Sequence, residues 1–326
     1  MTPLIEIPGT ELRVFPIALG GAPLGSAVAR GDAFRLMDEF VDGGGNMVDT
    51  ALVYANWLPD VEPSASERTI GEWMRLRGNR GRMIVTTKGA HPLLTSMDRP
   101  RMSEADIRED VEGSLRRLGV DTIDLYWLHR DDVGRPAGEI VETMNRFVRE
   151  GKIRHFGCSN WTVERMREAS RYAAEHGLQG FAGNQMMWSL AAVDRARLKD
   201  QTLVPMDGEM HAYHVETGMA ALPYSSQANG LFTKWERDAY AEDDERIAPQ
   251  YRLRENARRF ERCRKLAAER SVTVNRIVLA YLLGQPFPTV PIAGCRTSGQ
   301  LRDSLAAAEV RLTPDEVRYL EQGSSR

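Results

Sequence analysis

Residues 104–160 read EADIREDVEGSLRRLGVDTIDLYWLHRDDVGRPAGEIVETMNRFVREGKIRHFGCSN, and this stretch decides the fold. It begins with an amphipathic segment, Glu104–Leu118, whose apolar residues recur three or four positions apart, as they do on one face of a helix. The apolar run Ile123–Leu128 follows and is typical of a buried strand. The same order then repeats, with Ala137–Arg149 as a helix and Ile153–Cys158 as a strand. This alternation predicts parallel strands joined by helical crossovers.

The same alternation extends along the rest of the chain in both directions. Short apolar runs predict further strands at Ile17–Leu19, Asn46–Val48, Met83–Thr87, Gly180–Asn184, Met219–Pro223 and Thr289–Ala293. Helical periodicity predicts further helices at Asp32–Val41, Ser66–Leu76, Val163–His176, Tyr251–Arg270, Thr273–Leu283, Ser298–Ala308 and Thr313–Leu320. Eight strands with helices between them predict an α/β fold, a (β/α)8 TIM barrel, formed by one domain over residues 1–326. An open doubly wound sheet is the alternative, but the turn at residues 20–25, GGAPLG, lacks the GxGxxG spacing of such folds.

Four parts of the chain outside this alternation also bear on the architecture. Ile5–Ile7 and Leu12–Val14 predict a short hairpin that plugs the floor of the barrel. The long connections Ala55–Ser66 and Phe232–Gln250, the second with an acidic run at residues 242–245, are expected as loops at the C-terminal face, where barrel enzymes keep their active sites. Only residues 321–326 follow the last predicted helix, so we expect no long C-terminal tail over the pocket.

Composition excludes several classes of protein. The net charge of −3 and the pI of about 6.1 argue against a nucleic-acid-binding surface. The sequence contains no run of about 18 apolar residues, which argues against a membrane span. Three cysteines without a CxxC pair argue against a disulfide framework or a structural zinc site, and no signal peptide is visible. We therefore expect a cytoplasmic protein and leave its oligomeric state open.

Polar residues follow the predicted strands at the edge where a barrel mouth would form; they are Asp49, Tyr54, Lys88, His129, Ser159, Asn160, Gln185, Tyr224 and Ser225. A lysine ammonium beside a tyrosine lowers the pKa of its phenol, and a carboxylate such as Asp49 can hold Lys88 charged and oriented. A tyrosine with such neighbours can exchange a proton with a carbonyl oxygen, and His129 can hydrogen-bond to that oxygen. Because no side chain supplies hydride, carbonyl reduction here would require a nicotinamide cofactor.

Five short motifs resemble those of the aldo-keto reductase superfamily. They are MVDTALVY at residues 47–54, SERTIG at 66–71, VTTK at 85–88, DTIDLYWLH at 121–129 and GKIRHFGCSN at 151–160. The resemblance covers most of the chain and implies a catalytic tetrad of Asp49, Tyr54, Lys88 and His129. In this tetrad Tyr54 would act as general acid in reduction, with Lys88 and Asp49 tuning its pKa and His129 orienting the substrate carbonyl.

The resemblance also implies a set of cofactor-binding residues: Gly21, Ser159, Asn160, Gln185, Tyr224, Ser225, Gln227, Leu231, Lys234, Gly294, Arg296, Gln300, Asp303 and Ser304. Ser159, Asn160 and Gln185 would hold the nicotinamide carboxamide, Tyr224 would stack on the ring, and residues 224–231 would bind the pyrophosphate. The sequence departs from the family pattern at Ser226-Gln227, where Pro-Leu is usual, and at Asp303-Ser304, where Glu-Asn is usual. Arg296 can pair with a 2′-phosphate, which favours NADP(H) over NAD(H).

The expected partner is a small-molecule carbonyl or alcohol, with hydrophobic or aromatic aldehydes favoured. Trp57 and Trp188 are predicted to wall the substrate pocket, whereas Trp127 is predicted to pack between its strand and a helix. The sequence His211-x-x-His214-x-Glu216 has metal-ligand residue types but no third ligand at a strand end, so we expect no metal. Two alternatives remain open: a cofactor-binding regulatory subunit with little turnover, and a metal-dependent barrel isomerase.

Overall fold

Eight parallel strands form the centre of the protein in the computed structural model, which describes residues 2–238 and 245–323. In chain order they are β3 (Ala18–Gly20), β4 (Met47–Asp49), β5 (Ile84–Gly89), β6 (Ile123–Leu128), β7 (Ile153–Ser159), β8 (Gly183–Gln185), β9 (Ala220–Ala221) and β10 (Ile292–Ala293). Each pairs with its neighbour in the order β10-β3-β4-β5-β6-β7-β8-β9. The ring closes through a parallel bridge between Ala221 and Thr289, and the Val290 amide donates to the Ala221 carbonyl at 2.9 Å. The predicted barrel is therefore confirmed.

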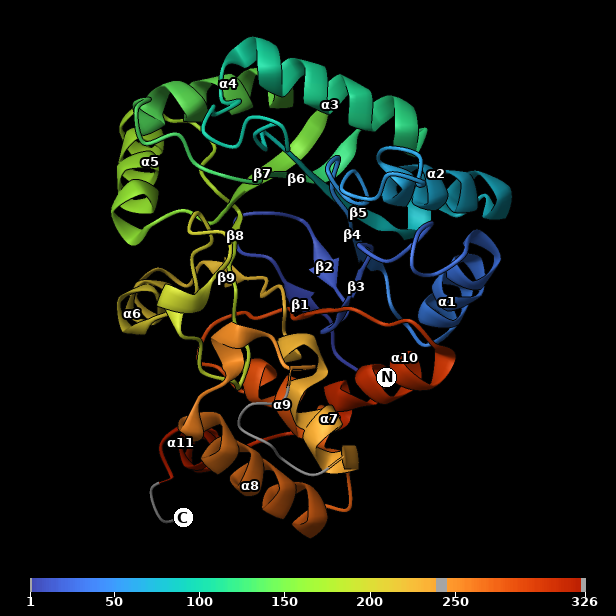
Figure 1. Cartoon of the computed structure of the whole chain (residues 1–326). Helices are drawn as coiled ribbons and strands as arrows, with labels where there is room; N and C mark the ends of the chain where they lie inside the picture. The colour runs from blue at the N-terminus through green and yellow to red at the C-terminus, as the bar shows by residue number, and fades with distance from the viewer. Residues whose placement is uncertain (1, 239–244, 324–326) are drawn as a thin grey trace.

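The helices lie outside this ring (Figure 1). They are α1 (Arg30–Asp42), α2 (Ala65–Arg77), α3 (Glu104–Leu118), α4 (Ala137–Arg149), α5 (Val163–Glu175), α6 (Gly208–Thr217), α7 (Leu231–Asp238), α8 (Arg254–Glu269), α9 (Val274–Leu283), α10 (Ser298–Ala306) and α11 (Pro314–Gln322). Short 3-10 turns occupy Arg80–Arg82, Arg195–Arg197, Ala228–Gly230, Pro249–Tyr251 and Ala307–Glu309. Among the described residues, none of these helices has the length and apolar character needed to cross a bilayer.

Helix α7 corrects one prediction, because it lies in the connection that we expected to be a loop. Its Phe232 and Trp235 rings pack against Phe260 of α8, with ring centroids 6.0 Å and 5.8 Å apart. Only two turns long, the helix shows too few apolar repeats for periodicity to reveal it in the sequence. Residues 242–244 of the predicted acidic run lie outside the described part of the chain.

The N-terminal hairpin fills the centre of the ring, as Figure 1 shows. Strands β1 (Ile5–Glu6) and β2 (Arg13–Val14) pair antiparallel. The side chains of Ile7, Leu12 and Val14 are buried in one cluster with residues from the N-terminal parts of the barrel strands, such as Met47 and Ala220. The hairpin therefore plugs the N-terminal end, as predicted, and leaves the opposite end for the site.

Trp127 also corrects a prediction, because its ring lies inside the barrel and not against a helix. A methyl group on Gly157 would stand 2.3 Å from the Trp127 ring, so the neighbouring strand makes room for it by lacking a side chain. Tyr126 faces outward toward α3 and belongs to the outer core. Alternation along β6 separates the two faces, but the six-residue apolar run gives no sign of which face is the inner one.

Candidate active site

Four ionisable residues meet at the C-terminal ends of β4, β5 and β6. Asp49 ends β4, Tyr54 lies in the loop after it, Lys88 lies near the end of β5, and His129 follows β6. The Lys88 ammonium donates to Asp49 Oδ2 at 2.6 Å, to the Thr50 carbonyl at 2.7 Å and to the Tyr54 hydroxyl at 3.0 Å. Lys88 is only 1% exposed, so all its donors act within the protein. The structure thus brings together the four residues predicted as a tetrad.

Burial and neighbouring charges have opposite effects on the pKa values of Lys88 and Tyr54. Burial disfavours the charged form of Lys88, but Asp49 and Tyr54 outweigh it and raise the pKa of the ammonium. Burial also raises the pKa of Tyr54, and the opposing pull of Lys88 does not cancel the rise. The sequence predicts the effect of Lys88 on the Tyr54 pKa but not the larger effect of burial. Tyr54 therefore keeps its proton at neutral pH and is suited to donate it.

Gln185 joins this group from the far side of the barrel. Its amide nitrogen donates to Asp49 Oδ1 at 2.7 Å, and the same oxygen accepts from the Thr86 hydroxyl at 2.7 Å. Gln185 is completely buried, and its carbonyl oxygen Oε1 has no hydrogen-bond partner among the described residues. A buried amide oxygen without a partner costs free energy unless a donor is supplied. The N–H2 of a nicotinamide carboxamide is a donor of the required kind.

His129 is held neutral by its surroundings. Burial, and then the positive charges of Arg130 and Lys88, place the pKa of its imidazole well below the usual range. Its Nδ1 is buried without a partner among the described residues. The ring of His91, from the segment after β5, meets the His129 ring edge to face at a centroid separation of 4.9 Å.

His91 and Arg130 are functional candidates that sequence reasoning missed. Arg130 directly follows His129 and is only 8% exposed, and His91 stands three residues after Lys88. Their position in the sequence is the signal that could have found them, because each residue closely follows a strand that already carries a predicted catalytic residue at or just after its end.

Asn160 connects three strand ends. Its side-chain oxygen accepts from the Tyr224 hydroxyl at 2.6 Å and from the Val204 amide at 3.0 Å. Its side-chain nitrogen donates to the His129 carbonyl at 3.3 Å and to the Ser159 hydroxyl at 3.1 Å. These four bonds use the whole hydrogen-bonding capacity of an amide side chain. Of the three residues predicted to hold the carboxamide, Gln185 is therefore the one with an open buried acceptor, and Asn160 already positions its neighbours.

The predicted phosphate segment is sharply turned. Ser225, Ala228 and Asn229 have left-handed backbone φ angles of 53°, 48° and 55°, and α7 begins immediately afterwards at Leu231. A helix N-terminus after such a turn directs backbone N–H groups toward one point, an arrangement that suits a phosphate. Lys234, in the first turn of α7, donates to the Arg246 carbonyl at 3.4 Å.

The segment predicted to bind the adenosine end lies beside this turn. Gln227 donates to the Ser304 hydroxyl at 3.3 Å, so the structure brings these two predicted residues together. Asp303 instead accepts from side chains of the α9 region, including Arg276 at 2.8 Å.

Arg296 is exposed, and its guanidinium makes no hydrogen bond or ion pair with the described residues. The remaining predicted contacts are Gly21, whose amide donates to the Asp49 carbonyl, Gly294, which is exposed, and Gln300, which accepts from the Arg296 amide.

The two tryptophans predicted at the substrate pocket have different surroundings. Trp57 is 54% exposed, and its ring lies edge to face with the Tyr54 ring at a centroid separation of 6.3 Å. Trp188 is buried, and its ring packs against Phe287 and His211 with centroids 5.9 Å and 6.2 Å away. Trp188 therefore belongs to the outer core, and its role at the substrate pocket stays a prediction. His211 and His214, the residues weighed as metal ligands, belong to the same aromatic cluster.

Comparison with known proteins agrees with this geometry. The model of the aldo/keto reductase family matches residues 16–324. An uncharacterized oxidoreductase, YrpG, of Bacillus subtilis (strain 168) is 31% identical over 95% of this chain and 92% of its own length. Norsolorinic acid reductase stcV of Emericella nidulans is 29% identical over 96% of this chain and 79% of its own length. Aryl-alcohol dehydrogenase [NADP(+)] of Phanerodontia chrysosporium is also 29% identical, over 96% and 83% respectively. With its barrel, its buried Asp49–Lys88–Tyr54 group and a family match over nearly its whole length, the chain belongs to the aldo/keto reductase family of oxidoreductases.

Proposed function

We propose that the protein reduces aldehydes and ketones to alcohols with NADPH, and that Tyr54 supplies the proton. The observation that carries this proposal is the Tyr54 hydroxyl held 3.0 Å from a buried, charge-paired ammonium at the open end of the barrel. A donor in that position can protonate the oxygen of a carbonyl while Lys88 stabilises the negative charge left on the phenol. Asp49 keeps Lys88 charged for this task.

A nicotinamide bound here would supply the hydride that no side chain can provide. The residues that fit it are Gln185, whose open Oε1 accepts from an amide N–H2, and Tyr224, whose hydroxyl is fixed by Asn160 so that its ring has one orientation. The turned segment at residues 225–230 and the N-terminus of α7 suit the phosphates. The Arg296 guanidinium, which has no ion-pair partner among the described residues, is available to a 2′-phosphate.

The protonation states favour reduction over oxidation. A tyrosine whose pKa is raised by burial holds its proton at neutral pH, as a general acid must. His129 is neutral, so it can hydrogen-bond to the substrate oxygen without adding a second positive charge beside Lys88. Because the raised pKa leaves little phenolate near neutral pH, the base that alcohol oxidation needs is scarce there.

The entrance favours apolar, aromatic substrates. Trp57 presents more than half of its surface beside the ring of Tyr54. Apolar side chains left open at the edge of a site bind apolar groups. The relative named as an aryl-alcohol dehydrogenase supports this choice of substrate class.

The test is the oxidation of NADPH by the purified protein with benzaldehydes, aliphatic aldehydes and sugars as substrates. We expect turnover with NADPH, a higher KM for NADH, and a preference for benzaldehydes. Arg296→Ala should raise the KM for NADPH about tenfold and leave that for NADH unchanged, as expected when a charge-assisted contact to one phosphate is lost. Equal KM values for the two cofactors in the wild type would refute the NADPH preference. Tight cofactor binding without turnover on any carbonyl would instead favour a regulatory subunit.

A further inference from the structure

Arg130 is a buried cation beside the tetrad that the proposed chemistry leaves without a role. We propose that it is a positioning residue for the reaction. Its guanidinium hydrogen-bonds to the segment of residues 198–206, here named the strap. This contact, here named the clasp, holds Asn160 and His129 in the positions that cofactor and substrate require. This proposal rests on the proposed function for its benefit to catalysis, but the clasp itself is a property of the protein alone.

The Arg130 side chain reaches from the end of β6 to the strap, which lies between β8 and α6. Its Nε donates to the Thr202 hydroxyl at 2.8 Å, and one terminal nitrogen donates to Asp200 Oδ2 at 2.8 Å. The other terminal nitrogen donates to the His129 carbonyl at 2.8 Å. The Arg130 side chain is 10% exposed and that of Asp200 is 31% exposed, so the pair is largely shielded from water. A planar guanidinium fixes all three directions at once, which an ammonium cannot do.

These bonds complete a closed ring of contacts. From Arg130 the ring passes to the His129 carbonyl, which also accepts from the Asn160 side chain at 3.3 Å. Asn160 accepts from the Val204 amide at 3.0 Å, and the strap returns through Thr202 to Arg130. The ring joins the ends of β6 and β7 to the strap. Release at Arg130 would leave the Val204 amide as the contact between the strap and Asn160, the residue that positions Tyr224.

The backbone of Asn160 has an uncommon conformation. Its φ angle of 61° lies in the left-handed region, which few residues other than glycine occupy, although asparagine does so more readily than most. An uncommon conformation of this kind persists where several contacts over-determine it. The side-chain bonds of Asn160 to His129 and Val204 are two such contacts, and the Arg130 clasp anchors both partners.

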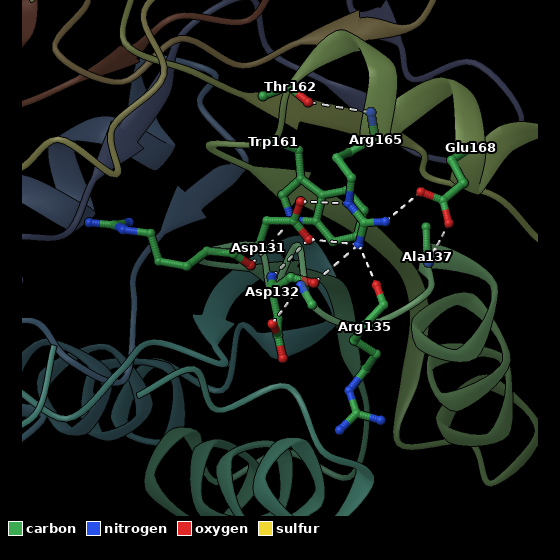
Figure 2. A network of polar contacts seen from close by, with 10 residues as sticks. Asp131, Asp132, Arg135, Ala137, Trp161, Thr162, Arg165 and Glu168 are labelled. Carbon is green, nitrogen blue, oxygen red and sulfur yellow. Dashed lines mark hydrogen bonds and ion pairs between the residues drawn. The ribbon is translucent and has the colours of Figure 1, made fainter. Parts of the chain in front are cut away.

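A second network joins Asp131, which follows Arg130 in the chain, to Arg165 of α5 (Figure 2). The indole of Trp161, next to Asn160, donates to the Arg130 carbonyl at 3.2 Å. Arg165 of α5 binds the carboxylate of Asp131 with its Nε at 2.9 Å, and the carbonyl of Arg135 at 2.8 Å. Its guanidinium also lies over the Trp161 ring, 5.2 Å from the centroid. The base of Arg130 is thus rigid, so its side chain can hold the strap at a defined distance.

Two conservative changes on the strap test the clasp without touching Arg130. Asp200→Asn keeps the shape and removes the charge, and Thr202→Val removes the hydroxyl. Arg197→Ala, on the 3-10 turn before the strap, breaks an exposed ion pair with Asp194 and serves as the matched control. Gly157→Ala serves as a second control, because it should destabilise the barrel without changing the strap.

The first measurement is amide hydrogen exchange in the protein without cofactor. We expect faster exchange over residues 198–206 in Asp200→Asn and Thr202→Val, with wild-type exchange over these residues in Arg197→Ala and Gly157→Ala. The second is NADP+ binding by calorimetry and stopped-flow release. We expect Kd to rise about tenfold in the two strap variants, mainly through faster release. In Gly157→Ala the melting temperature should fall while Kd stays at the wild-type value.

Wild-type hydrogen exchange in both strap variants would overturn the clasp. Faster exchange with unchanged Kd and release rate would overturn its positioning role. If the wild-type protein bound neither NADP+ nor NADPH, the proposed function would fail, whereas the exchange measurement would still decide whether Arg130 orders the strap.

Discussion

Gln185 Nε2 lies 2.7 Å from Asp49 Oδ1, and this hydrogen bond crosses the barrel between strands β8 and β4, which stand opposite each other in the ring. The same glutamine carries the open Oε1 that fits a nicotinamide carboxamide. One side chain thus touches both the proposed cofactor position and the carboxylate that holds Lys88.

Replacing Gln185 tests this double contact. Gln185→Met keeps the size of the side chain but removes the acceptor for the carboxamide and the donor to Asp49. We expect the Kd for NADP+ to rise about tenfold or more, because a buried hydrogen bond is lost on the cofactor side. Calorimetric titration measures it, with Gln322→Met, at the exposed end of α11, as the control. Unchanged affinity would show that Gln185 does not meet the cofactor.

The Lys88–Asp49 pair makes a prediction about stability. Lys88→Met leaves the carboxylate of Asp49 buried without its cation, and breaking one partner of such a pair costs about 3–5 kcal/mol. The double variant Lys88→Met/Asp49→Leu removes both charges and should recover much of that loss. Urea denaturation gives the free energies of unfolding. A double variant as unstable as Lys88→Met alone would show that the two charges are not coupled. Both variants should be inactive.

His129 should make stability depend on pH. The pKa of the folded imidazole lies well below the 6.5 of the unfolded chain. Between these two values the unfolded chain binds a proton that the folded protein does not, so the free energy of unfolding falls as the pH drops below about 6.5. His129→Gln removes this contribution and should lose about 1 kcal/mol less than wild type between about pH 6.5 and pH 5.5.

Denaturation at the two pH values measures the difference. Burial also lowers the pKa of His91 and His214, so part of the slope should remain in the variant. An equal loss in variant and wild type would mean that His129 takes up a proton in the folded state.

The close packing around Gly157 predicts that a side chain at this position destabilises the barrel. A methyl group there would lie 2.3 Å from the Trp127 ring and 2.7 Å from the Gly183 carbonyl. Gly157→Ala should therefore lower the free energy of unfolding by about 1–3 kcal/mol. Gly180→Ala is the control, because its methyl group would meet Ala173 at an ordinary 3.7 Å. Equal stability of the two variants would contradict the interior position of Trp127.

The sequence predicts the fold well because each strand and helix bears its own pattern. The boundaries of β6, α3 and α4 match those read from periodicity. It predicts less well what depends on neighbours distant along the chain. Trp127 is predicted on the wrong side of its strand, since a strand buried on both faces does not show which face is the interior.

The candidate site, too, can be predicted from the sequence only where a local motif records it. The motifs identify Asp49, Tyr54, Lys88 and His129, and the structure brings them within contact. The contacts of Arg130 with Asp200 and Thr202 could not be foreseen, because about 70 residues separate the partners and the strap has no regular pattern. The upward shift in the pKa of Tyr54 likewise depends on how deeply the fold buries the phenol, which no local motif records.

The proton-donating role of Tyr54 is the central claim, and Tyr54→Phe tests it most directly. The measurement is the rate of NADPH oxidation with an aromatic aldehyde, alongside the Kd for NADP+, in wild type, Tyr54→Phe and the control Tyr126→Phe, whose hydroxyl faces away from the mouth. We predict that kcat falls about a hundredfold to ten thousandfold in Tyr54→Phe alone, while Kd stays within about twofold. Turnover by Tyr54→Phe at the wild-type rate would contradict the account.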